Sequence, residues 1–117
     1  APEAAQSCSR APAAPTGFSG LSYACGAAAT SALRHMLARD PVVRCEQKDT
    51  DRYGRIVAVC ANSGGDLGGR LVATGHAIAY RRYGLAYVDH EDAAKAERVG
   101  IWAGTFQNPE QWRKERR

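Results

Sequence analysis

The sequence predicts a single α+β domain over residues 1–117, with a β-hairpin set among helices and held by disulfides. Three observations lead to this fold class. A chain of 117 residues has room for one hydrophobic core. Apolar residues recur at helical spacing in residues 23–39, and a β-rich pattern comes next in residues 41–61. The four cysteines form an even set in a short chain, which favours two disulfides.

The first 20 residues differ in composition from the rest of the chain. They are rich in Ala, Pro, Ser and Gly without any period, so we expect an irregular surface segment. From Tyr23 to Arg39 the helical spacing begins, with Ser22 as the expected cap. Pro41 ends this helix because proline cannot continue one.

Two segments with strand character come next, residues 41–48 and residues 55–61. The turn between them contains a glycine, which tolerates positive φ. If this turn centres just after Arg52, Cys45 lies directly opposite Cys60 and within disulfide range. A β-bulge would shift that register by one residue.

This register leaves Cys8 to pair with Cys25, which would tie the first segment to the start of the helix. Each disulfide then closes a loop of about 15 residues, worth about 3 kcal/mol in the chain-entropy model. Four buried free thiols are the alternative. A zinc site is disfavoured because no CxxC pair or histidine has ligand spacing. Disulfides predict a secreted or periplasmic protein.

The second half of the chain predicts three short helices. Asp66 caps the first, which ends by Gly75. Residues 89–99 form the next, with acids in the first turn and an (i, i+4) ion pair. Asn108 begins the last, with Pro at the first helical position. No apolar run is long enough to span a bilayer, so no membrane partner is expected.

The net charge of +4 and the pI near 9.1 favour an anionic partner. Residues 76–87 interleave aromatic and basic side chains, a pattern typical of a stacking platform for nucleic acid: Tyr80, Arg81, Arg82 and Tyr83. The alternative is that the tyrosines pack on the core with their hydroxyl groups in water. The basic residues 113–117 are expected to form a solvated helix face.

Three fragments occur in order, at residues 50–55, 71–75 and 100–102; they read TDRYGR, LVATG and GIW. With the opening APE, the YACG before the first helix and the WR near the end, they resemble the thermonuclease-like (staphylococcal nuclease-type) family in its exported bacterial branch. The resemblance covers the chain from end to end. It implies an OB-fold-like five-stranded barrel with three helices, of which this chain holds the C-terminal two-thirds.

The resemblance also implies an activity: calcium-dependent hydrolysis of DNA or RNA to 3′-phosphate products. Glu3 matches the family's general base, and Arg55 matches an arginine that binds the phosphate in the transition state. Arg52 and Tyr53 match turn positions that contact a terminal phosphate. Taken from the residues alone, Glu3 is a surface carboxylate and Arg55 a solvated hairpin arginine, and these alternatives stay open.

One departure from the family pattern concerns the metal. The family's first three strands carry one metal-binding aspartate and a further arginine, and its second metal-binding aspartate immediately precedes the motif that opens this sequence. None of these three residues has a match here, and the sequence starts as though cut just after the second aspartate. We expect those strands to come from another segment or another chain. Asp49 and Asp51 are expected turn formers. A noncatalytic nucleic-acid-binding or truncated remnant domain is therefore the alternative function.

Overall fold

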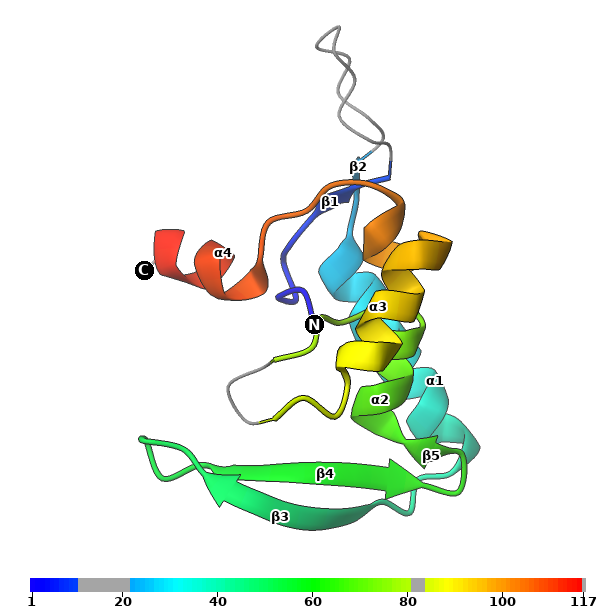
Figure 1. The fold of residues 1–117 in the computed structure, drawn as a ribbon, viewed down its shortest axis with the longest axis vertical. Coiled ribbons are helices and arrows are strands. Elements are labelled where there is room, and N and C mark those ends of the chain that lie inside the picture. The colour runs from blue at the N-terminus through cyan, green and yellow to red at the C-terminus, as the bar shows by residue number, and fades with distance from the viewer. Residues whose placement is uncertain (11–21, 81–83, 117) are drawn as a thin grey trace, which may run out of the picture.

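The computed structural model describes residues 1–10, 22–80 and 84–116. Helices and antiparallel sheets mix in this part of the chain, so the α+β class is confirmed. Three helices lie together on one side of the molecule (Figure 1): α1 (Cys25–Arg39), α2 (Leu67–Ala73) and α3 (Val88–Glu97). A hairpin lies across the end of this group, and a fourth helix stands apart from it: β3 (Arg44–Thr50), β4 (Ile56–Asn62) and α4 (Pro109–Glu115).

The strands of the described residues form a two-stranded and a three-stranded sheet, in the orders β1-β2 and β3-β4-β5. These sheets do not close on one another, so the described part of the chain contains no barrel. This differs from the five-stranded barrel that the resemblance implies. The number of described α-helices is four, one more than the resemblance implies.

The start of α1 corrects the sequence prediction. The helix begins at Cys25, and its N-cap is Ala24 without a side-chain cap hydrogen bond. Ser22 is not the cap, because it belongs to β2 (Ser22–Tyr23), whose backbone pairs with β1 (Cys8–Ser9). The first residues are therefore not wholly irregular. The helix ends at Arg39, before the proline, as predicted.

The hairpin register agrees with prediction at the cysteines but not at the turn. Cys45 lies opposite Cys60, and their Cα atoms are 4.0 Å apart. The register then shifts between Gln47 and Asp49, and the turn centres on Tyr53, slightly later than expected. The bulge and the displaced turn compensate for each other, and this compensation keeps the two cysteines opposed.

The core lies at the other end of the molecule, around the second disulfide. Cys8 and Cys25 are joined with their Cα atoms 5.6 Å apart, and both are buried beside Ile101 of the 3₁₀ helix η2 (Gly100–Ala103). Partly buried apolar side chains surround them: Tyr23, Ile78, Trp102 and Phe106. Both predicted cysteine pairs are thus joined, and none of the four cysteines is free.

The caps of the later helices agree with the sequence patterns. The Asp66 side chain accepts a hydrogen bond from the Gly69 N–H at 3.1 Å, and the Asn108 side chain accepts one from Glu110 at 2.9 Å. The short strand β5 (Gly65–Asp66) leads directly into α2. Asp66 also accepts hydrogen bonds from the Tyr87 hydroxyl, a contact that joins the start of α2 to the start of α3.

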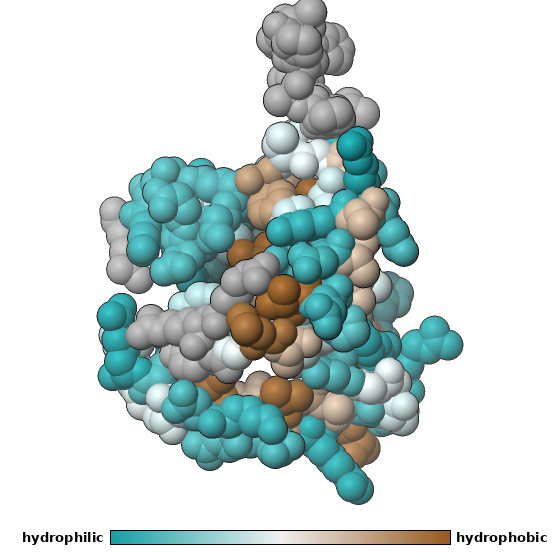
Figure 2. Space-filling model, in the orientation of Figure 1, coloured by the Kyte–Doolittle hydropathy of each residue, from teal (hydrophilic) through white to brown (hydrophobic). Residues whose placement is uncertain are grey.

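Apolar side chains gather between the helices and the hairpin on the face shown in Figure 2, whereas the surface over α4 is hydrophilic. The large apolar or aromatic side chains that are more than half exposed include Tyr53 (65%), Ile56 (68%) and Tyr80 (55%). Among the described helices, none combines the length and the apolar character needed to cross a membrane.

Candidate nucleic-acid groove

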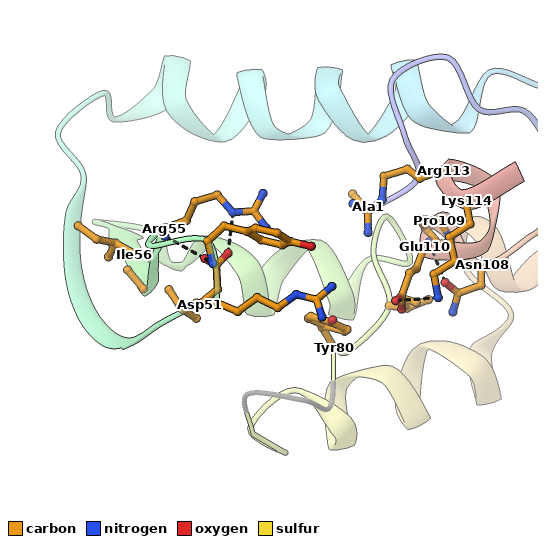
Figure 3. A pocket seen from close by; sticks show the side chains of 15 residues that line it. Ala1, Asp51, Arg55, Ile56, Tyr80, Asn108, Pro109, Glu110, Arg113 and Lys114 are labelled. Atoms are coloured by element: carbon orange, nitrogen blue, oxygen red, sulfur yellow. Dashed lines mark hydrogen bonds and ion pairs between the residues drawn. The ribbon is translucent and has the colours of Figure 1, made fainter. Parts of the chain in front are cut away.

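A groove of about 750 Å³ separates the hairpin turn from α4. One wall consists of the turn and the first residues of β4, and the other consists of the cap and exposed face of α4. Ile78 and Tyr80, from the segment after α2, also line the groove. Figure 3 shows Arg55 and Asp51 on one side of this space and Arg113 and Lys114 on the other.

Asp51 organises the turn that forms the first wall. Its Oδ1 accepts hydrogen bonds from the backbone N–H groups of Tyr53 and Arg55, both at 2.9 Å. Gly54 completes the turn at φ 80°, a conformation that favours glycine. Desolvation opposes ionisation of Asp51, but the hydrogen bonds from Arg55 and Tyr53 outweigh it and lower the pKa of this carboxyl. Asp51 therefore acts as a turn former, as expected.

Arg55 is fixed at the turn by the same carboxylate. Its Nε donates to Asp51 Oδ2 at 2.6 Å, and its guanidinium carbon lies 5.2 Å from the centre of the Tyr53 ring. The Arg52 guanidinium also lies over this ring, at 4.9 Å. Two cations and an aromatic face are thus brought together beside the groove, and such groups can contact a phosphate and a base.

The tyrosines of the aromatic and basic stretch have different surroundings. Tyr80 is exposed and lines the groove. Tyr87 lies elsewhere, and its hydroxyl donates to both carboxylate oxygens of Asp66, at 2.9 and 2.7 Å. Burial, together with this hydrogen bond and the negative charge of Asp66, raises the pKa of Tyr87 to about 12. The remaining predicted site residues lie outside the described residues: Arg81, Arg82 and Tyr83.

The second wall brings together residues from opposite ends of the sequence. Arg113 Nη1 lies 3.0 Å from Glu3 Oε1, and Arg113 lines the groove. Glu3 is not itself among the lining residues, so it adjoins the groove through this ion pair. Arg113 lies on the exposed face of α4, as expected for residues 113–117, and it also pairs with Glu3. No short-range sequence signal could have found this contact, because the partners lie in the first and last segments of the chain.

The described residues do not fit a calcium site. No group of three or more His, Cys, Asp or Glu side chains that could hold a metal ion occurs in residues 1–10, 22–80 and 84–116. Calcium prefers six to eight oxygen ligands. Both Asp51 oxygens accept hydrogen bonds within the turn, and Glu3 pairs with Arg113.

The fold and groove define an α+β domain with a cationic, aromatic-lined surface suited to an anionic ligand. Residues 2–104 match the family described as "Staphylococcal nuclease homologue", and the chain belongs to that family. The resemblance drawn from the sequence fragments is thereby confirmed.

Two curated proteins are similar to this chain. One is the "Succinoglycan biosynthesis protein ExoI" of Rhizobium meliloti (strain 1021), 36% identical over 86 residues, which cover 71% of this chain and 44% of that protein. The other is an "Uncharacterized endonuclease" of Haemophilus influenzae, 33% identical over 76 residues, which cover 62% of this chain and 43% of that protein. The matched part spans less than half the length of either relative.

Proposed function

We propose that the protein is a nuclease that hydrolyses phosphodiester bonds of DNA or RNA to 3′-phosphate products. Membership of the staphylococcal nuclease family supports this function, as does similarity to a protein named as an endonuclease. The observation that carries the proposal is the Arg55 guanidinium, held by Asp51 beside a groove with an exposed tyrosine on its wall.

Arg55 is the proposed phosphate clamp. Asp51 engages its Nε–H, and no hydrogen bond among the described residues engages Nη1 or Nη2. A guanidinium can bind two phosphate oxygens through parallel N–H groups, and it stays charged at any relevant pH. Because Asp51 already holds the Nε edge, the Arg55 side chain loses less conformational entropy when a phosphate binds. This arrangement favours the clamp over the solvated hairpin arginine.

Glu3 is the proposed general base. An ionised carboxylate can accept the proton of an attacking water, and its side chain here is 30% exposed rather than fully solvated. Calcium is the proposed metal because the family resemblance implies it. Since the described residues do not supply its ligands, only Glu3 and Arg55 are assigned roles in the hydrolysis.

Nucleic acid is the proposed partner, with the strand lying along the groove. Tyr53 and Tyr80 present exposed rings on which bases can stack, and Arg52 supplies a further cation. Three residues beyond the described part of the chain belong to the same proposed binding set: Arg81, Arg82 and Tyr83. The net charge of +4 adds attraction to phosphates that does not depend on base sequence.

Further strands are proposed to pack on the hairpin, contributed by another segment or another chain. Every residue of β3 is exposed and no residue of β4 is fully buried. Isolated hairpins are only marginally stable, so an apolar side chain such as Ile56, 68% exposed, favours a covering partner. The two disulfides support a secreted or periplasmic location, where an oxidising environment preserves them.

A noncatalytic nucleic-acid-binding domain is the second candidate, because the described residues contain no metal-ligating cluster. An oligonucleotide degradation assay with calcium or with a chelator separates the two candidates when it is run on the protein together with the further strands proposed to pack on its hairpin. If the protein is a nuclease, we expect calcium-dependent cleavage and products whose 3′-phosphate groups a phosphatase removes. Binding of the oligonucleotide without cleavage in either condition would instead support the binding domain.

A further inference from the structure

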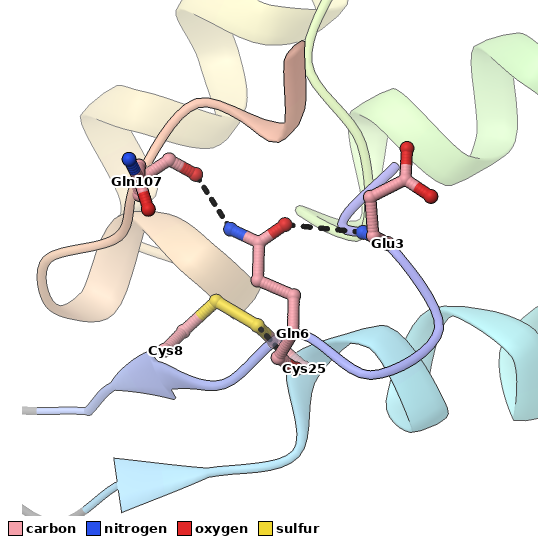
Figure 4. Close-up of a disulfide and its surroundings, with 5 residues drawn as sticks. All are labelled: Glu3, Gln6, Cys8, Cys25 and Gln107. Carbon is pink, nitrogen blue, oxygen red and sulfur yellow. Dashed lines mark hydrogen bonds between the residues drawn. A yellow bond between two sulfur atoms is a disulfide. The ribbon is translucent and has the colours of Figure 1, made fainter. Parts of the chain in front are cut away.

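The backbone at Glu3 is held by a buried glutamine. The Glu3 N–H donates to Gln6 Oε1 at 3.1 Å, and Gln6 Nε2 donates to the Gln107 carbonyl at 2.6 Å, as Figure 4 shows. Gln6 is only 1% exposed, and its backbone N–H donates to the Glu3 carbonyl at 2.8 Å. Glu3 is therefore connected to the segment that leads into α4.

Helix α1 fixes the same backbone from the other side. The Gly26 N–H donates to the Gln6 carbonyl at 3.1 Å. A Cβ atom at position 26 would overlap the carbonyl group of Glu3, so the close approach depends on the absence of a side chain there. Because its backbone is held in this way, the conformational freedom left to Glu3 is mainly that of its side chain.

Arg113 restricts that remaining freedom. Its Nη1 lies 3.0 Å from Glu3 Oε1, and it is the cation that pairs with Glu3 among the described residues. The neighbouring cations of α4 have other contacts. Lys114 pairs with Glu110 at 3.5 Å, and Arg116 lies over the Trp112 ring at 4.1 Å.

We propose that Arg113 is a positioning residue, which holds the Glu3 carboxylate in one orientation beside the groove. This inference rests on the proposed function, in which Glu3 accepts a proton from the attacking water. Arg113 suits the role because a guanidinium keeps its charge and offers several donors in a fixed plane. It also makes α4 part of the site, although the sequence of this helix indicates only a solvated surface.

A direct phosphate contact is the competing role for Arg113, because the side chain lines the groove and is 55% exposed. The two roles predict different kinetics. A phosphate contact present in both ground and transition states acts mainly on KM, and it acts whether or not position 3 carries a carboxylate. A positioning residue acts on kcat, and its effect depends on that carboxylate.

The test measures kcat and KM for oligonucleotide cleavage in a double-mutant cycle of Arg113→Ala and Glu3→Gln, made in the protein together with the further strands proposed to pack on its hairpin. Arg113→Lys tests rescue by another cation, and Arg116→Ala removes the same charge at the C-cap of the same helix, outside the groove. We expect Arg113→Ala to lower kcat about 10- to 100-fold with a much smaller change in KM. In the Glu3→Gln background the substitution should add little, Arg113→Lys should recover part of the rate, and Arg116→Ala should match the wild type.

The outcomes separate this inference from the proposed function. Equal effects of Arg113→Ala with and without the Glu3 carboxylate, or a change confined to KM, would overturn the positioning role while leaving the nuclease intact. An unchanged kcat in Arg113→Ala would do the same. A wild-type protein that binds the oligonucleotide but never cleaves it would overturn the proposed function, and the inference would fail with it. Thermal unfolding of each variant checks that the rates compare folded proteins.

Discussion

Asp51 holds Arg55 by its backbone and its side chain together, since Oδ1 accepts from the Arg55 N–H at 2.9 Å and Oδ2 from Nε at 2.6 Å. One carboxylate thus shapes the turn and orients the guanidinium that faces the groove. The Arg55 side chain is 74% exposed, so this ion pair contributes little to overall stability. Its main consequence is the geometry of the proposed phosphate clamp.

This relationship predicts a dependence on acid. The folded-state pKa of Asp51 lies below the ordinary value of 3.8, so its stabilisation of the turn is complete above that value. This stabilisation is lost as the pH falls below 3.8 and then below the lowered pKa of Asp51. An NMR titration should show a protected Arg55 Nε–Hε signal at neutral pH that disappears in acid. Asp51→Asn should lack that protected signal at every pH, and an unaltered signal in this variant would contradict the assignment.

Salt should weaken nucleic-acid binding steeply, because phosphate contacts release counterions. We expect Arg52→Ala and Arg55→Ala each to reduce the slope of log affinity against log salt by about one. Arg44→Ala removes a charge from the same hairpin outside the groove and should leave the slope nearly unchanged. Fluorescence titration of a labelled single strand provides the measurement. The binding surface would have to lie elsewhere if the wild-type affinity did not change with salt concentration. Full binding by the Arg81→Ala/Arg82→Ala double variant would lead to the same conclusion.

The two disulfides should contribute unequally to stability. Removing Cys45–Cys60 with two alanines should lower the free energy of unfolding by about 2–4 kcal/mol, the usual range for a disulfide. Removing Cys8–Cys25 should cost more, because both residues are buried in the core beside Ile101 and their loss also leaves a cavity. Urea denaturation measures both variants. Equal losses, or peptide mapping that links Cys25 to Cys45, would count against this account.

Gly26 should tolerate no side chain. Because a Cβ there overlaps the Glu3 carbonyl, Gly26→Ala should cost about 1–3 kcal/mol of stability, as overpacking does, and should displace Glu3. Ala27→Ser, at an exposed position of the same helix, is the matched control. The free energy of unfolding, measured by chemical denaturation, and the cleavage rate should both fall for Gly26→Ala but not for Ala27→Ser. A fully stable and active Gly26→Ala variant would show that the first segment lies elsewhere.

Local patterns account for much of the fold. Periodicity, caps and turn residues predict features that depend on neighbouring residues, such as the Asp66 cap and the end of α1 before Pro41. These patterns fail where a distant segment offers a residue other backbone hydrogen bonds. Ser22, for example, pairs with the first segment of the chain instead of capping the helix. The predicted cysteine pairing is correct, but it comes from a register that omits the bulge before Asp49.

The candidate site is less predictable. The turn residues lie within six positions of one another, so a short fragment indicates Arg52, Tyr53 and Arg55 as a group. The second wall depends on α4 lying against the first segment, which results from the buried Gln6 and the Gly26 contact. Such long-range packing has no periodic signature, so the sequence indicates only an ordinary surface arginine at Arg113.

The most direct test of the central claim, that Arg55 clamps the scissile phosphate, is the rate of calcium-dependent oligonucleotide cleavage by wild-type protein and by Arg55→Ala. We expect cleavage to 3′-phosphate ends, abolished by chelator, and a rate about 100- to 1,000-fold lower in Arg55→Ala, since one oxyanion-type donor is worth roughly 3–4 kcal/mol. Thermal unfolding should change little. Because the described residues do not supply calcium ligands, the assay includes the further strands proposed to pack on the hairpin, and residues 1–117 without them should cleave very slowly. Cleavage by Arg55→Ala at the wild-type rate would contradict the account.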